Sequence, residues 1–358
     1  MSSNVERELT TFVVTHSPAA NLPPRKRVSS DNLEAATRLT PPAMVRLLPL
    51  IAVLLLPAMT CRAQRLPEGD YPRIHDPSTV VVEKGEAWCL STGQGIHLLK
   101  REAHGRWKKM APLFTEFPAW HKVEVPKNTG HLWAPDIIRV RDRWLIYYSV
   151  SSFGSNESAI GLVSGKTLDS ASKDYGWTDE GMVIRSRRSN RFNAIDPAVI
   201  ADGKKLWMSF GSFWDGIFLL ELDPETGLRK QGAEPLRLAM NPEIEAPFIH
   251  KHGDYYYLFV NWGKCCKGVD STYEIRVGRS KEITGPYKDK EGADMKEGGG
   301  SPFLGTDGRF IGPGHASIFV EKGKEMLVHH YYDKDRRGRS DLRMLPMEWQ
   351  DGWPVIGK

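Results

Sequence analysis

Three acidic residues stand at the head of similar segments in this 358-residue chain. Asp76 and Asp196 each precede a proline, and Glu245 precedes Ala-Pro. One Asp-Pro pair is ordinary turn chemistry. Three acids at matching places in repeats indicate a site, because like charges brought together are unfavourable unless chemistry uses them. Two positioned carboxyls can cleave a glycosidic bond, one as general acid and one as base or nucleophile, while a third raises the pKa of the acid.

The segments that carry these acids belong to a repeat with five copies. Each copy has a small or acidic residue beside Pro or Gly, a short strand, a charged turn and a second, aromatic-rich strand. The copies recur about every 60 residues, which leaves room for two further strands in each. Alignment of the strands gives as leading positions Asp76, Ala134, Asp196, Glu245 and Gly314.

The elements that would position these residues are strands. From Gln64 onward there is no long stretch of helical periodicity, and short apolar runs bounded by Gly, Asp, Asn and Pro recur. Repeats of four short strands are typical of propellers, because one blade cannot bury both of its faces alone. We therefore expect an all-β fold, a single five-bladed β-propeller over residues 64–358, with the three acids converging on its axis.

Residues 44–63 have the pattern of a secretory signal peptide, with one arginine before an uncharged apolar run. That run holds two prolines and is too short to cross roughly 30 Å of hydrocarbon as a helix. Residues 1–43 are expected to be a disordered or mis-assigned extension, and translation from Met44 or from Met1 stays open. We expect a secreted or periplasmic protein that begins near Gln64.

The composition is that of an ordinary globular protein, with 40% hydrophobic and 26% charged residues. The net charge of +5 is too small for a polyanion binder, so we expect no nucleic-acid partner. We also expect no membrane partner after signal cleavage, and a monomer. Pairing among Cys89, Cys265 and Cys266 stays open, and their spacing does not favour zinc.

The eleven tryptophans fit a carbohydrate substrate, because an indole ring can stack on a sugar face. Four lie within apolar strands and are expected in the core: Trp88, Trp107, Trp144 and Trp207. Trp133 and Trp214 flank the expected channel-lining positions and are candidates for substrate contact.

A set of motifs in fixed order carries a family resemblance. They are HDPS at 75–78, WAPDI at 133–137, NAIDP at 193–197, GSFWDGI at 211–217, EAP at 245–247, CCKGVDSTYEIRVGRS at 265–280 and GPGH at 312–315. Together they resemble the arabinan endo-1,5-α-L-arabinosidases of glycoside hydrolase family 43. The resemblance implies one five-bladed propeller, an inverting mechanism and secretion to degrade arabinan in pectin side chains.

The resemblance also implies roles for individual residues. Asp76 matches the general base, Glu245 the general acid, and Asp196 the residue that modulates the acid's pKa. The matched substrate-contacting positions are Asn193, Ser212, Phe213, Trp214, Gly154 and Trp133. His315 resembles a histidine beside a central calcium ion, so we expect Ca²⁺ there, although one imidazole is an unusual ligand for a cation that prefers oxygen.

Several alternatives stay open. His75 fits an orienting residue or a plain turn residue. Glu243 shares a strand face with Glu245, so the acid assignment depends on the repeat alignment. The same fold also serves exo-acting α-L-arabinofuranosidases, β-xylosidases, retaining fructan-active enzymes and non-catalytic lectins. A lectin needs no three axial acids, and the segments at 211–217 and 265–275 favour the arabinanase, whose expected endo action depends on loop shape.

Overall fold

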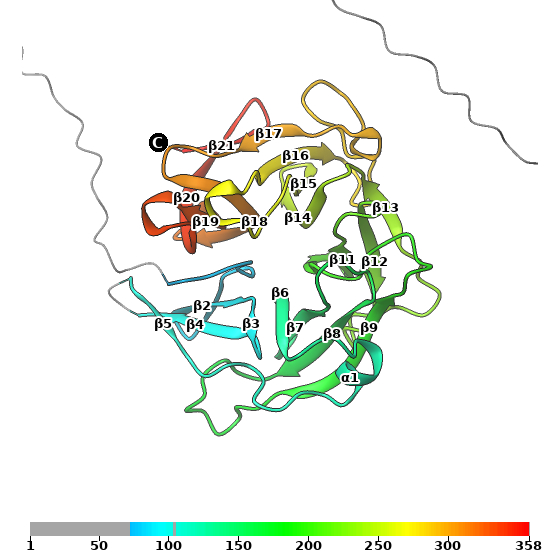
Figure 1. Cartoon of the computed structure of the whole chain (residues 1–358), viewed down its shortest axis with the longest axis vertical. Coiled ribbons are helices and arrows are strands. Elements are labelled where there is room, and N and C mark those ends of the chain that lie inside the picture. Colours follow the sequence, from blue (N-terminus) through cyan, green and yellow to red (C-terminus); the bar gives the residue numbers. More distant parts are fainter. Residues whose placement is uncertain (1–71, 103–104, 358) are drawn as a thin grey trace, which may run out of the picture. The chain divides into compact units, whose positions relative to one another are not determined.

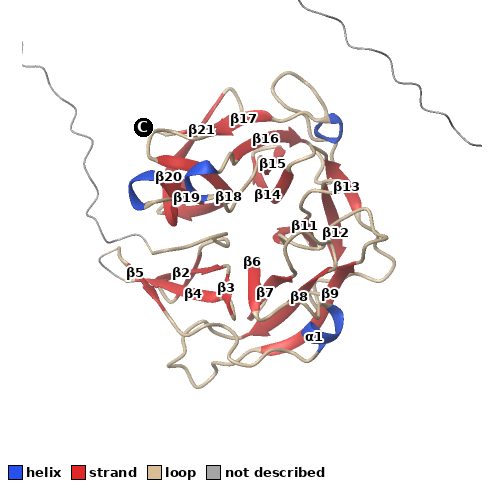
Figure 2. Ribbon diagram, in the orientation of Figure 1, coloured by secondary structure: helices blue, strands red, loops and turns tan. Residues whose placement is uncertain are grey.

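The structure is a computed structural model that describes residues 72–102 and 105–357, which form strands for the most part (Figure 2). The strands make five antiparallel sheets that follow one another around a ring, with β6, β14 and β18 toward its centre (Figure 1). The expected five-bladed propeller is confirmed. The predicted extension at 1–43 and signal peptide at 44–63 lie outside the described residues. Within the described part, no helix is long and apolar enough to cross a membrane.

Each blade is a meander of four strands. Blade 1 contains β1 (Val81–Glu83), β2 (Glu86–Ser91), β4 (His97–Arg101) and β5 (Trp107–Lys109). Blade 2 contains β6 (His131–Val140), β7 (Arg143–Val150), β8 (Ser158–Gly165) and β9 (Thr178–Ser186), with the short β3 (Gly93–Gln94) beside β6. Blade 3 contains β10 (Ala198–Asp202), β11 (Lys205–Phe210), β12 (Ile217–Leu222) and β13 (Leu236–Ala239).

The last two blades complete the ring. Blade 4 contains β14 (Ile244–His252), β15 (Tyr255–Trp262), β16 (Glu274–Ser280) and β17 (Ser301–Leu304). Blade 5 contains β18 (Phe310–Glu321), β19 (Lys324–Asp333), β20 (Arg339–Gln350) and β21 (Trp353–Ile356). Helical segments among the described residues are short: α1 (Trp120–Glu124), η1 (Gly268–Asp270), η2 (Met295–Glu297) and η3 (Lys334–Arg336).

The core lies between neighbouring blades. One cluster packs Trp88 of blade 1 against Ile137 and Trp144 of blade 2, and the other blade junctions are filled in the same way. Full burial of a large apolar side chain contributes about 1.5–3 kcal/mol. Trp88, Trp144 and Trp207 are buried as predicted, while Trp107 is half-buried at the edge of its cluster.

A backbone feature marks the start of every blade. One residue in each adopts the left-handed conformation, with φ between 42° and 58°: Asp76, Ala134, Asp196, Ala246 and His315. In blades 2, 4 and 5 the strand register shifts at this residue, as in a β-bulge that re-aims side chains. The strand alignment expected from the sequence is therefore wrong by one residue in the fourth and fifth copies.

The physical reason for that error lies in the choice of anchor. The prediction matched Glu245 to Asp196 because both are acids. The backbone matches Ala246 instead, and in four of the five copies the left-handed residue is the one before a proline. Glu245 thus occupies the place of His75 in blade 1, one residue before the kink.

Hydrogen bonds join each kinked residue to the preceding blade. Its N–H donates to a side chain at the end of that blade's second strand, in the pairs Ala134 to Thr92 (2.8 Å), Asp196 to Ser149 (3.0 Å), His315 to Asn261 (2.9 Å) and Asp76 to His330 (3.1 Å). The fifth place is held by Gly211, which has no side chain. There the N–H of Ala246 donates to the Asp196 carboxylate at 3.2 Å instead.

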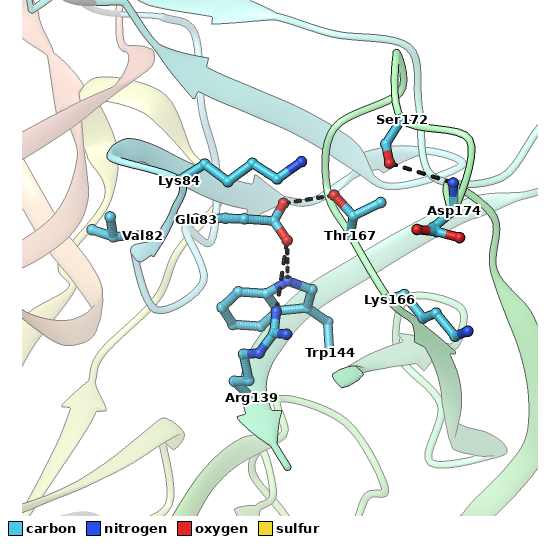
Figure 3. Close-up of a pocket in the computed structure, with 9 residues that line it drawn as sticks. All are labelled: Val82, Glu83, Lys84, Arg139, Trp144, Lys166, Thr167, Ser172 and Asp174. Atoms are coloured by element: carbon cyan, nitrogen blue, oxygen red, sulfur yellow. Dashed lines mark hydrogen bonds and ion pairs between the residues drawn. The ribbon is translucent and has the colours of Figure 1, made fainter. Parts of the chain in front are cut away.

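A pocket of about 430 Å³ lies at the junction of blades 1 and 2, at the far ends of their first strands (Figure 3). Its buried Glu83 accepts hydrogen bonds from Thr167 at 3.0 Å and from the Trp144 indole at 3.1 Å, and pairs with Arg139 at 3.6 Å. Both carboxylate oxygens of Glu83 bond to residues of blade 2, and none of the kinked residues lines the pocket. We therefore assign the pocket a structural role.

Candidate active site

The fold brings the three predicted acids to the same end of the inner strands. The Asp196 and Glu245 residues are 8% and 7% exposed, and the side chain of Asp76 is 14% exposed. The Asp196 carboxylate accepts the N–H of Ala246, the neighbour of Glu245. The charge of Asp76 raises the pKa of both other acids, so the three act on one another electrostatically.

Basic and polar side chains surround Asp76. Its Oδ2 is 2.8 Å from His75 Nδ1 and accepts a hydrogen bond from Thr92 Oγ1 at 2.5 Å. Its Oδ1 lies 3.6 Å from His315 Nδ1 and 3.7 Å from His330 Nδ1. Burial alone would raise the pKa of Asp76, but the imidazoles, His75 above all, outweigh burial and hold the pKa below its usual range. Asp76 is therefore a carboxylate, the form that a general base requires.

His75 is an orienting residue rather than a plain turn residue. Its Nε2 is 2.7 Å from the Tyr332 hydroxyl, and its ring stacks on His330 with the centroids 4.1 Å apart. Burial lowers the pKa of His75, but the charge of Asp76 and the hydrogen bond to Asp76 outweigh burial and raise the pKa to about 10. The ring is thus fixed on both sides and donates to the Asp76 carboxylate.

Glu245 has neutral partners instead. Ser212 Oγ donates to its Oε2 at 2.7 Å, and the Tyr273 hydroxyl donates to its Oε1. Burial raises the pKa of Glu245, the two hydroxyls offset part of that rise, and the charge of Asp76 adds to it. The net pKa is raised, which suits a general acid. Glu243, the alternative acid, pairs with Lys264 at 3.1 Å and its side chain is 38% exposed, so it lies outside this site.

Asp196 feels the charges of both Glu245 and Asp76. Burial, then the charges of Glu245 and Asp76, raise its pKa well above the usual range. Each of the two buried acids therefore has a raised pKa, and loss of the second proton from the pair is opposed by the charge that the first leaves behind.

The predicted substrate contacts on the 193–214 side lie close to Glu245. Ser212 touches it directly, and the N–H of Phe213 donates to the Ile244 carbonyl at 2.7 Å. Phe213 and Trp214 both have positive φ, and Trp214 is 39% exposed, so this turn presents an indole to solvent. Asn193 is buried, and its Oδ1 has no hydrogen-bond partner. It is an available acceptor for a hydroxyl.

The predicted substrate contacts in blade 2, Trp133 and Gly154, lie beside an exposed aromatic side chain, Phe153. The Trp133 ring lies 4.9 Å from the ring of Phe153, which is 80% exposed. The Trp133 indole N–H donates to His131 Nδ1 at 3.0 Å. Gly154 follows with φ 71° and has open space around it. Phe153 was not predicted, although its place next to the predicted contact Gly154 was a signal.

The residues around His315 could hold a calcium ion only if water supplied most of its ligands. Its side chain is 13% exposed, and the adjacent cluster that could hold an ion consists of His75, Asp76 and His330. Among these residues the only carboxylate is Asp76, whereas calcium prefers six to eight oxygen ligands. Water would have to supply most of the coordination shell, and no catalytic step needs to pass through a metal.

Sequence reasoning missed three residues that contact the acids: Thr92, Tyr273 and His330. Thr92 directly follows the second strand of blade 1 and His330 lies near the end of that of blade 5, so comparing these places across the repeats would have found them. Tyr273 lies in the quoted motif at 265–280, but no spacing rule connected it to Glu245.

The three cysteines in the described part of the chain are free thiols. Cys89 is buried in blade 1. Cys266 Sγ lies 3.7 Å from His75 Nε2, and a hydrogen bond from Cys265 lowers the pKa of Cys266 to about 5. The edge of the site beside His75 therefore carries a thiol with a lowered pKa.

Comparisons with known proteins agree with this geometry. Residues 71–354 match Glycosyl hydrolases family 43. An extracellular exo-α-(1→5)-L-arabinofuranosidase of Cellvibrio japonicus is 42% identical over 320 residues, 85% of this chain and 90% of the relative. An extracellular endo-α-(1→5)-L-arabinanase of Bacillus subtilis is 41% identical over 291 residues, 78% of this chain and 87% of the relative.

A solved structure shares the whole propeller. It is an exo-1,5-α-L-arabinanase from a bovine ruminal metagenomic library, with a TM-score of 0.78 and 42% identity over 81% of this chain and 99% of that one. Sequence motifs, blade count, axial acids and relatives all lead to the same assignment. The chain belongs to glycoside hydrolase family 43 and is a glycosidase.

Proposed function

We propose that this chain hydrolyses α-1,5-L-arabinofuranosidic bonds in arabinan with inversion at the anomeric carbon. The observation that carries the proposal is the contrast between two buried carboxyls at one end of the propeller. Burial would raise the pKa of both, but the imidazoles hold the pKa of Asp76 below its usual range, whereas burial and the charge of Asp76 leave the pKa of Glu245 raised. The names of the Cellvibrio and Bacillus relatives support arabinan as the polymer.

The residues divide the reaction as follows. Asp76 takes a proton from a water molecule, whose oxygen attacks the anomeric carbon. Glu245 gives its proton to the glycosidic oxygen as the bond to the leaving sugar breaks. Asp196 keeps that proton on Glu245 until it is needed. At the end Asp76 is protonated and Glu245 is ionised, and exchange with solvent restores both.

Inversion requires room for the attacking water. The carboxyl groups of Asp76 and Glu245 should lie about 6.5–9.5 Å apart for this chemistry. Product analysis by NMR during hydrolysis should show the β-anomer first. The α-anomer appearing first would mean retention and would overturn the assignment of Asp76 as a base.

Substrate contact is proposed for the two aromatic surfaces and for Asn193. Trp214 and the Trp133–Phe153 pair offer ring faces to sugars. Asn193 Oδ1, Ser212 and the backbone around Gly154 offer polar partners. Trp133, Phe153 and Gly154 belong to blade 2, whereas Asn193, Ser212 and Trp214 belong to blade 3, so a bound chain of several sugars would contact both blades.

We further propose endo action, in which the enzyme cuts within the polymer. The Bacillus relative is named as endo-acting and the Cellvibrio relative as exo-acting, so the mode needs a direct test. Digestion of linear α-1,5-arabinan should give a mixed ladder of oligomers at early times. A single short product from the start would instead show the exo mode.

Secretion, a monomeric state and a calcium ion near His315 complete the proposal. The named extracellular relatives support secretion, and intact-mass analysis of exported protein should give a chain that begins near Gln64. Light scattering should give a single-chain mass. If calcium binds beside His315, chelation and His315→Ala should each lower activity much more than thermal stability, and elemental analysis should find the ion.

A further inference from the structure

A cluster of three metal-binding side chains lies outside the active site, at the junction of blades 4 and 5. It consists of His250 and His252 on β14 and Glu325 on β19. Glu325 Oε1 lies 2.9 Å from His250 Nε2 and 3.6 Å from His252 Nδ1, and the donor atoms of the three all lie within 4.8 Å of one another. The two histidines are two residues apart on one strand, so their rings share a face.

Trp349 of β20 holds this cluster in place. Its indole N–H donates to Glu325 Oε2 at 2.6 Å, which leaves Oε1 directed at the histidines. Its ring stacks on His252 with the centroids 3.8 Å apart and on His250 at 6.2 Å. A carboxylate fixed through its second oxygen and imidazoles fixed by stacking are the kind of support that orients metal ligands in proteins.

The location separates this cluster from catalysis. Glu245 stands at the start of β14 and His252 at its end, so the two lie roughly 20 Å apart along the strand. Figure 1 shows the sheet of β14 beside that of β19 and β20, so an ion here would join two blades. The side chain of His252 is 40% exposed, which leaves one side open to water.

The donor set selects the class of ion. Two imidazole nitrogens and one carboxylate suit zinc and its neighbours among the divalent transition metals, whereas calcium and magnesium prefer oxygen. Tetrahedral zinc, with ligands at 2.0–2.2 Å, separates its ligand atoms by about 3.4 Å. The observed separations of 2.9 and 3.6 Å lie on either side of that value. Small side-chain movements would bring all three donors onto one ion.

We propose that His250, His252 and Glu325 form a binding site for a divalent transition-metal ion, with water as the fourth ligand, that clamps blade 4 to blade 5 on the side away from the active site. An ion bound only by the folded chain stabilises the fold in proportion to the logarithm of its free concentration. The site therefore acts on stability and leaves hydrolysis unchanged.

Zinc titration of chelator-treated enzyme tests the proposal. Isothermal titration with ZnCl₂ compares each variant with the wild type, so that any zinc bound by the cluster of His75, Asp76 and His330 is common to all of them. The wild type should bind one zinc equivalent more than His252→Ala, and Glu325→Gln should weaken that equivalent at least tenfold. Zinc should raise the melting temperature of the wild type and not that of His252→Ala. All variants should hydrolyse the substrate at the wild-type rate.

Two controls keep the result specific. His97→Ala removes a half-buried histidine of blade 1 and should bind zinc as the wild type does. Ni²⁺ or Cu²⁺ should quench part of the tryptophan fluorescence, and Trp349→Phe should abolish that part, because its ring lies against His252. If His252→Ala does not fold, Glu325→Gln decides. Equal zinc stoichiometry and affinity in the wild type and Glu325→Gln, or no zinc bound by the wild type, would overturn the site.

Discussion

Asp76 and Glu245 show how one propeller axis produces two opposite carboxyl groups. Both are shielded from solvent, and both oxygens of each carboxyl group have hydrogen-bond or ion-pair partners. Histidines surround Asp76, whereas only hydroxyl groups contact Glu245. Burial by itself raises the pKa of both acids, so the difference between them comes from their partners. The half of the site built by blades 1 and 5 therefore lowers the pKa of its carboxyl group, and the half built by blades 3 and 4 raises the pKa of its own.

Loss of the base should have the largest effect. Asp76→Ala removes the group that activates water, so hydrolysis of arabinan should fall by at least about 10²–10⁴-fold. An aryl arabino-oligosaccharide, whose phenolate leaves without a proton, should be equally slow. Initial rates on both substrates measure this. Rescue by the aryl substrate would show that Asp76 is not the base.

Loss of the acid should depend on the leaving group. Glu245→Ala should lose about 10²–10⁴-fold on arabinan, whose leaving alcohol needs a proton. On the aryl substrate much of that loss should disappear. Glu243→Ala is the matched control two residues away, and it should leave both rates near those of the wild type because Glu243 faces Lys264. If only Glu243→Ala showed this pattern, the two acids would have to be exchanged.

The pair of Asp196 and Glu245 should show a shift in pH dependence of known sign. The charge of Glu245 raises the pKa of Asp196, and because the interaction is mutual, an ionised Asp196 raises the pKa of Glu245. Asp196→Asn removes one negative charge while keeping the shape. The basic limb of the pH–rate profile should therefore move to lower pH. A basic limb that stays in place or moves upward would separate Asp196 from the control of Glu245.

Tyr273→Phe should move the same limb in the opposite direction by a smaller amount. The Tyr273 hydroxyl donates to Glu245 and thereby favours the ionised form. Removing that donor should raise the pKa of Glu245 and extend activity to higher pH. Circular dichroism should confirm the fold, because Tyr273 is buried. A downward shift would mean that the hydroxyl stabilises the protonated acid.

The sequence predicted the fold and the three acids, but not the exact alignment of the repeats, and the reason is physical. Repeat length, aromatic strands and the three acids predicted the propeller and the composition of its axis. The repeat alignment failed at Glu245 because it followed residue chemistry, whereas the left-handed backbone follows the residue before proline. One residue of error reverses the face of a strand.

The partners of the acids could not be predicted because they come from distant segments. His330 and Tyr332 reach Asp76 and His75 across more than 250 residues of sequence. Asp136, two residues after its kink, is another buried acid, yet its carboxylate accepts N–H groups of Thr79 and Val199 and so joins three blades. Nothing in its local motif distinguishes this structural acid from a catalytic one.

The hydrogen bond between the kinked residue Asp196 and the preceding blade gives the prediction with the smallest effect on activity. Ser149 is buried, and its hydroxyl accepts the N–H of Asp196 from the next blade. In Ser149→Ala that N–H loses its partner, which costs about 1–3 kcal/mol of unfolding free energy. Chemical denaturation should show this loss, whereas hydrolysis should change only slightly because the carboxyls keep their own contacts.

Ser91→Ala is the matched control for this change, since Ser91 is equally buried on a second strand but its hydroxyl has no partner. Removing an unpaired buried hydroxyl should leave stability unchanged or increase it. The two serines therefore separate the loss of a hydrogen bond from the loss of an oxygen atom. Equal destabilisation in both variants would mean that packing, and not the bond to Asp196, holds blade 3 against blade 2.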